Sequence, residues 1–436
     1  MKLNLRSKET LVNDLEIVRS ETLELMEQIP ESFLFNPPKP FMGPIIWDLA
    51  HIAKFEEIWI LINAAGLKEK SNLSDDDFNA IKTPRKIREE LNLPSLRDSL
   101  EYMSKTRNQV FDILDSASLD TDDKLLKNGY VFDLVIQHEY QHQETILQSL
   151  ALFDSPSFIC PKPKPQNETT FEEKMVLVPA GDFVLGTAHS GFAYDNELPS
   201  HTTFLEEFFI DSAPVSNERY LNFIESDGYN REDLWSERGM KWKTEEDAES
   251  PLYWYKENGT WFRRVFDKVM EIPPKEPLIH VSYWEAEAFA NFEGKRLPTE
   301  QEWEKACRWD PSTGETYSYP WGEEEPDNHK ANIGKNRWCP APIGSYEESV
   351  SPSGCHQMLG DVYEWTSSSF LPYDGFEAFP YDEYSAVHFG EEYKVLRGAS
   401  WATSGKVARA TFRNWDFPER RQLFAGFRCA MDSDKT

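Results

Sequence analysis

The chain has 436 residues, which is long for a single hydrophobic core, so two domains are expected. It contains 46 basic and 76 acidic residues, which gives a formal net charge of −30. Nucleic acids and anionic membranes select for basic protein surfaces, so this balance disfavours both as partners. The charge does not by itself indicate a cationic substrate, because a solvated acidic surface is the commoner cause.

The start of the chain and the cysteines both favour a cytoplasmic protein. The first residues become charged before the apolar core of a signal peptide could form, and no segment approaches the roughly 18 apolar residues of a membrane span. The five cysteines are odd in number and widely spaced, at Cys160, Cys307, Cys339, Cys355 and Cys429. This spacing argues against a disulfide framework or a cysteine zinc site, so reduced thiols are expected.

Apolar residues recur at helical spacing in four stretches of the first third, residues 8–28, 44–63, 95–115 and 130–152. The first three faces are formed by Leu11, Leu15, Val18 and Met26; by Trp47, His51, Phe55, Ile58 and Ile62; and by Leu96, Leu100, Met103, Val110 and Leu114. Ser95 and Asp98 resemble a capping box at the start of the third stretch. We therefore expect an antiparallel four-helix bundle over residues 1–154, with a long second connection.

The composition changes after the bundle. Residues 155–172 are rich in proline and polar residues and are expected to form a linker. In residues 173–436, short β-type runs such as MVLVPAG and FVLG are separated by Gly, Pro, Trp and Asn turns. Two helices there each begin with a capping box, at Ser282–Glu285 and Thr299–Glu302. This second domain is expected to be α+β, with much irregular structure.

Three histidines fall on core-facing positions of the predicted bundle: His51, His138 and His142. His138 and His142 are four residues apart, so they project from one helix face and could reach one metal ion. Buried polar rings need partners, which either a shared metal or neighbouring core groups would supply. Imidazoles suit zinc, iron, copper and nickel alike, and three protein ligands leave positions open for catalysis. Glu144 could accept a hydrogen bond from an imidazole, or be an ordinary charged helix residue.

The chain resembles the sulfoxide synthases of ergothioneine biosynthesis, also called hercynine oxygenases. The similarity runs over nearly the whole chain and is carried, in order, by PIIWDLAHIAKFEEIW, VIQHEYQHQETILQ, KRLPTEQEWEKAC, YPWG, MLGDVYEWTSS, YKVLRGASW and TFRNWDFPERRQLFAGFRCA. The resemblance implies a multidomain fold. An all-α, DinB-like four-helix bundle would be followed by an α+β, C-type-lectin-like domain of the formylglycine-generating-enzyme (sulfatase-modifying) type.

The same resemblance implies an iron(II) cofactor (Fe²⁺) bound by the three histidines. The implied reaction uses O2 to join a thiol sulfur to the imidazole C2 of hercynine, a trimethylated histidine, and gives a sulfoxide. Tyr381 matches the family's catalytic tyrosine, a proton donor, although from the residues alone a packed loop aromatic would be the commoner case. The implied hercynine-binding residues are Gln141, Tyr384, Asn414 and Trp415.

The implied thiol donor is γ-glutamylcysteine rather than cysteine. Arg85, Arg88, Asp416 and Arg420 match residues that contact this donor in the members that use it. Arginine forks suit carboxylates bidentately, so lysine would be a poor substitute. The loop after Arg88 has two more residues before NLP than the family pattern, which bears on Arg88 first. From the residues alone, both arginines would be solvated loop charges.

Several alternatives stay open at this point. A formylglycine-generating oxidase would need a cysteine pair in SWATSGKVARATFRN, which contains none. A DinB-type metal-dependent thiol transferase would leave the second domain without a task, and a lectin-like binding module would leave the three histidines unexplained. The nearest competitors are the same chemistry with cysteine or a selenium donor, and an ovothiol-pathway 5-histidylcysteine sulfoxide synthase.

Overall fold

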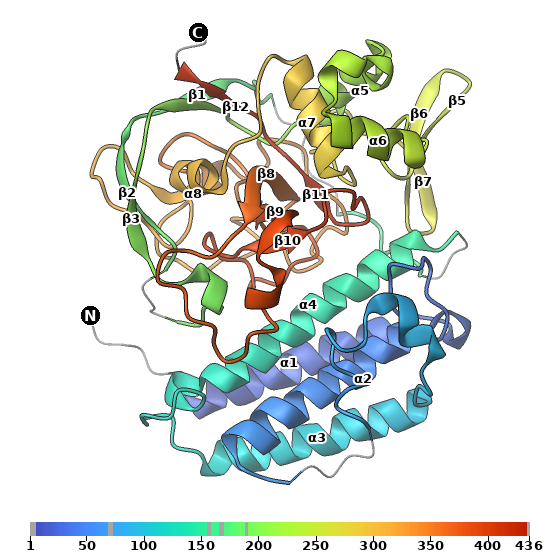
Figure 1. The fold of residues 1–436 in the computed structure, drawn as a ribbon, viewed down its shortest axis with the longest axis vertical. Coiled ribbons are helices and arrows are strands. Elements are labelled where there is room, and N and C mark those ends of the chain that lie inside the picture. The colour runs from blue at the N-terminus through green and yellow to red at the C-terminus, as the bar shows by residue number, and fades with distance from the viewer. Residues whose placement is uncertain (1–5, 69–72, 155–157, 165–169, 188–190, 434–436) are drawn as a thin grey trace. The chain divides into compact units, whose positions relative to one another are not determined.

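The computed structural model describes residues 6–68, 73–154, 158–164, 170–187 and 191–433. The chain divides into two compact units (Figure 1). Unit 1 comprises Met1–Ile159 with His189–Phe192, and unit 2 comprises Cys160–Ala188 with Ala193–Thr436. Part of the segment predicted as a linker, residues 155–157 and 165–169, lies outside the described residues.

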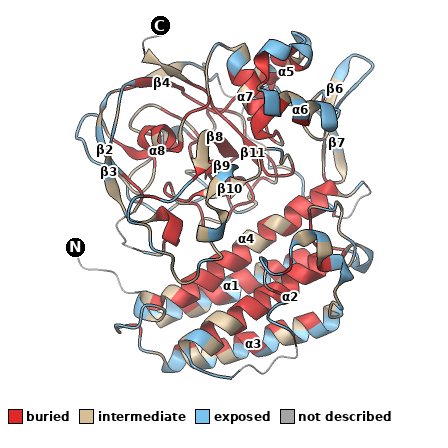
Figure 2. Ribbon diagram, viewed as in Figure 1, coloured by how far each residue is buried: buried red, intermediate tan, exposed pale blue. Residues whose placement is uncertain are grey.

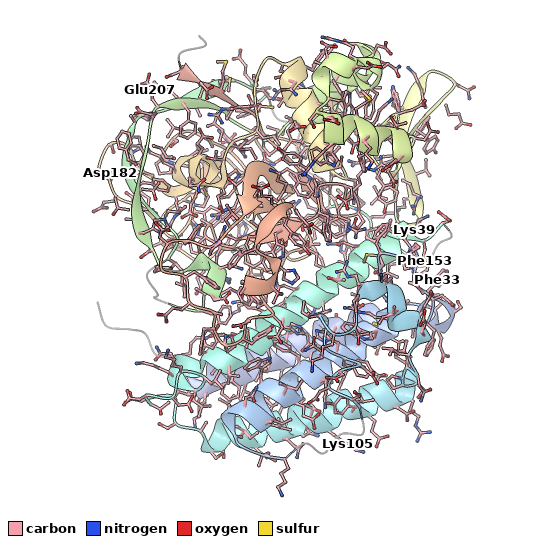
Figure 3. All side chains as sticks on the ribbon, viewed as in Figure 1. Phe33, Lys39, Lys105, Phe153, Asp182 and Glu207 are labelled. Carbon is pink, nitrogen blue, oxygen red and sulfur yellow. The ribbon has the colours of Figure 1, made fainter. Side chains whose placement is uncertain are left out.

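The main helices described in unit 1 are α1 (Lys8–Glu27), α2 (Ile45–Glu56), α3 (Leu96–Ser116) and α4 (Tyr130–Leu152). They confirm the four predicted helical stretches. Ser95 begins α3 as predicted, because its side chain accepts a hydrogen bond from the Asp98 N–H at 3.1 Å. All twelve residues of α2 are buried (Figure 2), since this helix packs against both α3 and α4. One end of α4 is fixed by Phe153, whose ring meets Phe33 edge-on at 4.8 Å (Figure 3).

The apolar face predicted for the second helical stretch is wrong in its last turns. Residues Glu57–Ala64 form a π-helix, in which backbone bonds run from i to i+5 and each turn holds more residues. Ile58 and Ile62, expected on the core face, are therefore only half-buried, while Ile60 and Leu61 are buried. A sequence reading at α-helical spacing cannot anticipate this change of phase.

The core of unit 1 contains a neutral cluster of two arginines and two glutamates from four helices. Arg19 Nε donates to Glu139 at 2.8 Å and its Nη2 donates to Glu56 at 2.9 Å. Arg107 bonds to the same two carboxylates. Thr22 adds a hydroxyl donor to Glu139 at 2.8 Å. Every charge has a partner, which is the condition under which buried ions are tolerated.

Replacing Glu139 with glutamine is expected to destabilise unit 1 by about 3–5 kcal/mol, because a buried positive charge loses its partner. Burial alone would raise the pKa of Glu139, but Arg19 and Arg107 outweigh burial and bring the pKa to about 2. The pKa is lowered in the folded state, so this stabilisation is present above the usual glutamate pKa and is lost as pH falls towards 2. Urea unfolding at pH 7 and pH 3 measures both effects. Glu16→Gln, on an exposed site of α1, is the control. A wild-type and Glu139→Gln difference that stays constant between the two pH values would contradict this assignment.

The described strands of unit 2 form four small sheets. Their strands, in spatial order, are β1 (Met175–Val178), β4 (Phe208–Asp211) and β12 (Ala430–Asp432); β2 (Gly181–Leu185) and β3 (His201–Leu205); β5 (Trp254–Glu257), β6 (Thr260–Val265) and β7 (Lys268–Glu271); and β10 (Asn414–Asp416), β9 (Gly390–Gly398), β8 (Tyr363–Phe370) and β11 (Ala425–Gly426). Neighbouring strands are antiparallel except β8 and β11, which are parallel.

Four helices are described in unit 2: α5 (Asn217–Glu225), α6 (Glu237–Glu245), α7 (Tyr283–Phe292) and α8 (Glu300–Arg308). The capping boxes predicted for α7 and α8 are both present. Helix α8 packs its Trp303 into a core with Phe183, Ile210 and Leu359. All five cysteines are buried and free, as expected. Among the described helices, none is long and apolar enough to cross a membrane.

Candidate active site

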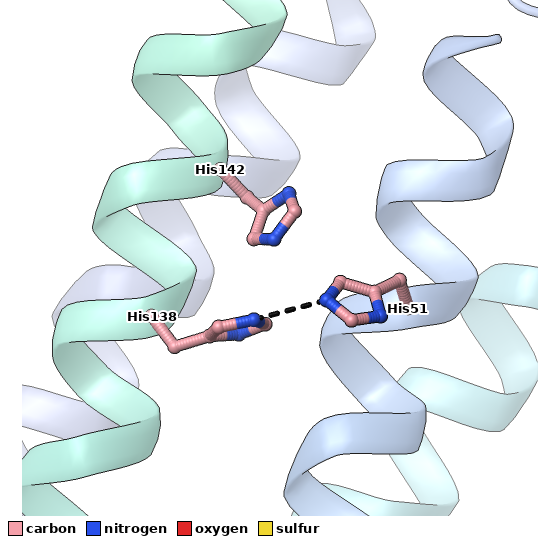
Figure 4. A group of neighbouring side chains, drawn as sticks. All are labelled: His51, His138 and His142. Carbon is pink, nitrogen blue, oxygen red and sulfur yellow. Dashed lines mark hydrogen bonds between the residues drawn. The ribbon is translucent and has the colours of Figure 1, made fainter. Parts of the chain in front are cut away.

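Helices α2 and α4 bring three imidazoles together in the interior of unit 1 (Figure 4). His51 comes from α2, and His138 and His142 come from successive turns of α4. One ring nitrogen of each lies within 4.8 Å of the others, and the Nε2 atoms of His51 and His138 are 3.0 Å apart. The predicted convergence of these side chains is thus what the structure shows.

Each imidazole is held by a different neighbour. His51 Nδ1 bonds to the carbonyl oxygen of Phe78 at 2.6 Å, and His142 Nδ1 bonds to Asp48 Oδ1 at 2.9 Å. Both acceptors take an N–H, which leaves the Nε2 lone pair of His51 and of His142 available. The His138 ring stacks on Phe55, with centroids 3.7 Å apart and planes 7° from parallel.

This donor set fits a divalent transition metal. Burial lowers the pKa of His51 and of His138 well below the usual value, and the neighbouring His142 lowers both further. The two rings are therefore neutral at pH 7, which is the form that binds metals. Imidazole nitrogens bind metals such as zinc at about 2.0–2.1 Å, so two nitrogens that share one ion lie only about 3–3.4 Å apart. The observed 3.0 Å between His51 Nε2 and His138 Nε2 lies at the short end of that range.

The loop between α2 and α3 positions His51. Besides the Phe78 carbonyl, it supplies the Asp77 carbonyl, which accepts from Trp47 Nε1 at 2.9 Å. It also supplies Asp75, which pairs with the fully buried Lys54 at 2.6 Å. Trp47 stacks on His51 at 4.5 Å between ring centroids. The long second connection predicted from the sequence is thus part of the site's support, a role that spacing alone did not reveal.

Asp48 is a supporting residue that sequence reasoning missed. It is 2% exposed, lies one turn before His51 on α2 and accepts from His142. Glu144, a candidate acceptor for an imidazole N–H, is buried in α4, and that role stays a prediction. The sequence signal that could have identified Asp48 is its position in the run WDLAH, three residues before His51 and on the same buried helix face.

Replacing Asp48 with alanine is expected to lower metal affinity about 10–100-fold, because carboxylates that orient ligand histidines typically contribute this much. Asp48→Asn retains an acceptor and should lose less. Titration against a chromogenic chelator measures the affinity, and Asp112→Asn on the exposed side of α3 is the control. Equal affinity in wild type and Asp48→Ala would show that His142 is oriented by something else.

Arg88 packs on Trp47, the ring that stacks on His51. Its guanidinium carbon is 3.4 Å from the centre of the Trp47 ring, and its Nε donates to Thr83 O at 3.1 Å. Burial lowers the pKa of Arg88 to about 9, with Asp48 opposing the shift, so the side chain is cationic at pH 7. Gly43 permits this packing, since a Cβ there would lie 3.0 Å from Arg88 Cδ. Within the described ranges, its Nη1 and Nη2 make no hydrogen bond.

Arg85 lies on the same side of this loop as Arg88. It is half-buried, with Nη1 3.5 Å from the Phe41 carbonyl and 3.7 Å from Met42 Sδ. The two arginines predicted to bind the thiol donor therefore both lie against the segment that leads into α2. Gln141, predicted to face the substrate, is half-buried one residue before His142, and its role stays a prediction.

In unit 2, the predicted aromatic residues form one group. The ring centroid of Tyr384 lies 6.4 Å from that of Tyr381 and 5.6 Å from that of Trp415, and both contacts are edge-on. Trp415 also stacks on Phe370, with centroids 4.2 Å apart and planes 6° from parallel. Strand β10 places Trp415 opposite Val395 of β9, so the ring is fixed by the sheet as well as by stacking.

The polar residues predicted for unit 2 share the same strand or follow it. Asn414 Oδ1 accepts from the Trp415 N–H at 2.9 Å. Asp416 pairs with Arg420, with Nε and Oδ1 3.8 Å apart, and both side chains are about one fifth exposed. Asn414, Trp415, Asp416 and Arg420 are thus presented together, while their roles stay predictions.

Comparison with known proteins agrees with this arrangement. Residues 14–146 match the DinB superfamily and residues 161–433 match the Sulfatase-modifying factor enzyme 1-like domain, which confirms the predicted fold class. The formylglycine-generating enzyme of Streptomyces coelicolor is 29% identical, covering 63% of this chain and 94% of its own length. The hercynine oxygenase of Mycolicibacterium smegmatis is 40% identical and that of Mycobacterium tuberculosis 41% identical, each covering 98% of this chain and 99% of its own. This identity over nearly the full length of both chains shows that the protein belongs to the hercynine oxygenase family and is an oxidoreductase.

Proposed function

We propose that this protein is an iron(II)-dependent sulfoxide synthase of ergothioneine biosynthesis. It joins the thiol of γ-glutamylcysteine to imidazole C2 of hercynine and oxidises the sulfur. The observation that carries this proposal is the convergence of His51, His138 and His142, the first two buried and the third partly buried, in a chain similar over its length to proteins named hercynine oxygenase. The free, buried state of all five cysteines supports the expectation of a reducing compartment, the cytoplasm.

The atoms and electrons of this reaction balance without an added reductant. Hercynine loses the hydrogen on C2, the thiol loses its hydrogen, and a C–S bond forms, which releases two electrons. Oxidation of the sulfur to the sulfoxide releases two more. One oxygen atom of O2 stays on the sulfur, and the other leaves as water with the two hydrogens.

The histidines would hold the iron, which supplies the redox chemistry with O2 and favours the thiolate form of the donor. The remaining tasks belong to side chains. Tyr381 supplies a proton during oxygen reduction. Trp415 offers a π face to the trimethylammonium group of hercynine. Asn414 and Gln141 offer amide donors and acceptors to its imidazole and carboxylate.

The donor assignment rests on cations suited to the glutamyl carboxylate. Arg88 is buried, cationic and has its two terminal nitrogens uncommitted within the described ranges, which is how a receptor for a carboxylate is built. Arg85 adds a second fork nearby. Asp416 and Arg420 supply an anion for the donor's ammonium group and a further cation. Free cysteine lacks the glutamyl arm and would leave some of these groups unused.

With hercynine and equal concentrations of γ-glutamylcysteine and cysteine, the γ-glutamyl sulfoxide is expected to be the main product. Arg88→Ala should lower kcat/KM for γ-glutamylcysteine about 10- to 100-fold, since hydrogen bonds to a charged group contribute about 1.5–3 kcal/mol. Arg85→Ala should act in the same direction. Lys86→Ala, an exposed cation between them, is the matched control. Mass spectrometry of the products identifies the donor used.

Other outcomes of the competition assign other donors. Preference for cysteine, or an unchanged kcat/KM in the Arg85→Ala, Arg88→Ala double variant, would overturn the γ-glutamylcysteine assignment. Preference for a selenium donor would keep the bond-forming chemistry and change the substrate. Coupling to histidine in place of hercynine would identify an ovothiol-type synthase.

A further inference from the structure

A buried segment of unit 2, residues 194–197, contacts the loop that carries the two tyrosines of the proposed site. Asp195 and Asn196 are 1% exposed, and Glu197 is fully buried. Glu197 fixes the segment to the core, since it accepts from Arg409 Nη2 at 2.7 Å and from the Thr411 hydroxyl at 2.6 Å. It also accepts from the backbone N–H of residue 194 at 2.9 Å. The segment is therefore a rigid support.

Asp195 bonds to both ends of the loop formed by residues 379–385. Its Oδ1 accepts from the Ser385 hydroxyl at 2.5 Å, and its Oδ2 accepts from the Phe379 N–H at 3.3 Å. The same hydroxyl accepts from Asn196 Nδ2 at 3.1 Å. One carboxylate thus holds the two points between which Tyr381 and Tyr384 lie.

We propose that Asp195 is the positioning residue for the proposed proton donor: by fixing both ends of the loop, it sets where the Tyr381 hydroxyl lies. The inference rests on the proposed function for the role of Tyr381. It assigns Asp195 no contact with substrate, so its effect on the reaction passes through the tyrosine.

The loop depends on such anchors because residues 379–385 form turns rather than a helix or a strand. Ser385 is fully buried, while Tyr381 and Tyr384 are half-buried. Stacking extends the support: Tyr384 lies on Tyr194, with centroids 4.1 Å apart and planes 14° from parallel. Tyr381 in turn meets Tyr384 edge-on. The two ends of the loop are thus held by hydrogen bonds, while Tyr381 and Tyr384 between them stay partly exposed.

Burial raises the pKa of Asp195 to about 6, although the hydrogen bonds from Ser385 and Phe379 favour the charged form. The carboxylate is therefore mainly ionised at neutral pH and can accept both bonds. An asparagine in its place has one acceptor oxygen, so it can accept the bond from only one of the two anchors, and its amide N–H must face the other.

The same segment also supports the strand proposed to bind hercynine. Arg413 Nη1 donates to the Asn196 carbonyl at 2.9 Å, and Arg413 forms a two-pronged pair with Glu300, with both bonds at 2.9 Å. Arg413 directly precedes Asn414 and Trp415 in the sequence. Residues 194–197 therefore contact both the loop of residues 379–385 and the residue that precedes β10, and hold the two segments in fixed positions.

The test compares Asp195→Asn and Ser385→Ala with wild type in the full-length, iron-loaded protein. Both variants are expected to lower kcat for sulfoxide formation about 10- to 100-fold, as small misplacements of reacting groups do. KM for the thiol and iron content should stay close to wild type. A larger share of thiol should be oxidised to sulfinic acid, which takes both oxygen atoms of O2 and needs no bond to hercynine. Asp382→Asn removes an exposed charge from the same loop and should behave as wild type.

A double-mutant cycle separates positioning from general structural damage. In a Tyr381→Phe background, Asp195→Asn should have little further effect, because the group that it positions is already gone. Wild-type kcat and product ratio in both variants would overturn the inference. So would losses that multiply in the double variant, or losses matched by falls in iron content and thermal stability. Sulfoxide formation by wild type in the same assay tests the proposed function separately, since its absence would overturn that proposal and leave the bonds of Asp195 to Ser385 and Phe379 as they are.

Discussion

His51→Ala is expected to abolish sulfoxide formation and to remove most of the bound iron. The substitution takes away one of three converging nitrogens and leaves His138 Nε2 without its neighbour at 3.0 Å. A carboxylate that merely orients a ligand histidine contributes about 10–100-fold to metal affinity, so loss of a ligand should cost more than that. Iron content by elemental analysis and turnover with hercynine measure the two losses.

Two comparisons make this result specific. His51→Gln keeps a polar side chain of similar size and should still lose iron, because an amide is a poor ligand beside imidazoles. His329→Ala removes an exposed histidine from unit 2 and should retain both iron and turnover. Full retention of iron and activity in His51→Ala would show that the metal is held elsewhere.

Tyr381→Phe is the second large effect, with sulfoxide formation expected to fall about 100- to 10,000-fold, the range typical of a general acid. The ring and its edge-on contact with Tyr384 remain, so folding, iron content and thiol affinity should be unchanged. Oxygen and thiol still react, so sulfinic acid from the thiol should become the main product. Rapid-quench analysis of both products measures the partition.

Tyr255→Phe is the control for Tyr381→Phe, because Tyr255 is 40% exposed on β5 and can lose its hydroxyl without consequence for the site. An unchanged rate of sulfoxide formation in Tyr381→Phe would mean that another group provides the proton. In that case, the positioning role proposed for Asp195 would be wrong as well.

Local sequence signals were enough to predict most of the helices. The three capping motifs at Ser95, Ser282 and Thr299 mark helix starts because they satisfy free N–H groups locally, without help from distant residues. Apolar spacing located the helices of unit 1 for a similar reason. It failed where α2 runs on into the π-helix, since Ile60 and Leu61 are buried by a backbone change that spacing does not encode.

In the candidate site, too, local spacing identified some residues and missed those whose roles depend on tertiary contacts. His138 and His142 could be paired from their spacing on one helix, and His51 from its place on a buried face. Asp48 and the Phe78 carbonyl could not be assigned, because their roles depend on how a long loop and a neighbouring helix meet the imidazoles. Asp195 was missed for the same reason, being 184 residues from Phe379 and 190 from Ser385 in the sequence.

The proposed reaction is tested most directly by loading the protein with iron(II) under anaerobic conditions, adding hercynine and γ-glutamylcysteine, and admitting isotopically labelled O2. In the expected product, hercynine and the thiol are joined through sulfur, and the sulfur carries one labelled oxygen, with the second label in water. Loss of the label from hercynine deuterated at C2 would identify the bond to that carbon. Failure to form any coupled product from hercynine, or equal formation by metal-free protein, would show that this protein is not an iron-dependent sulfoxide synthase.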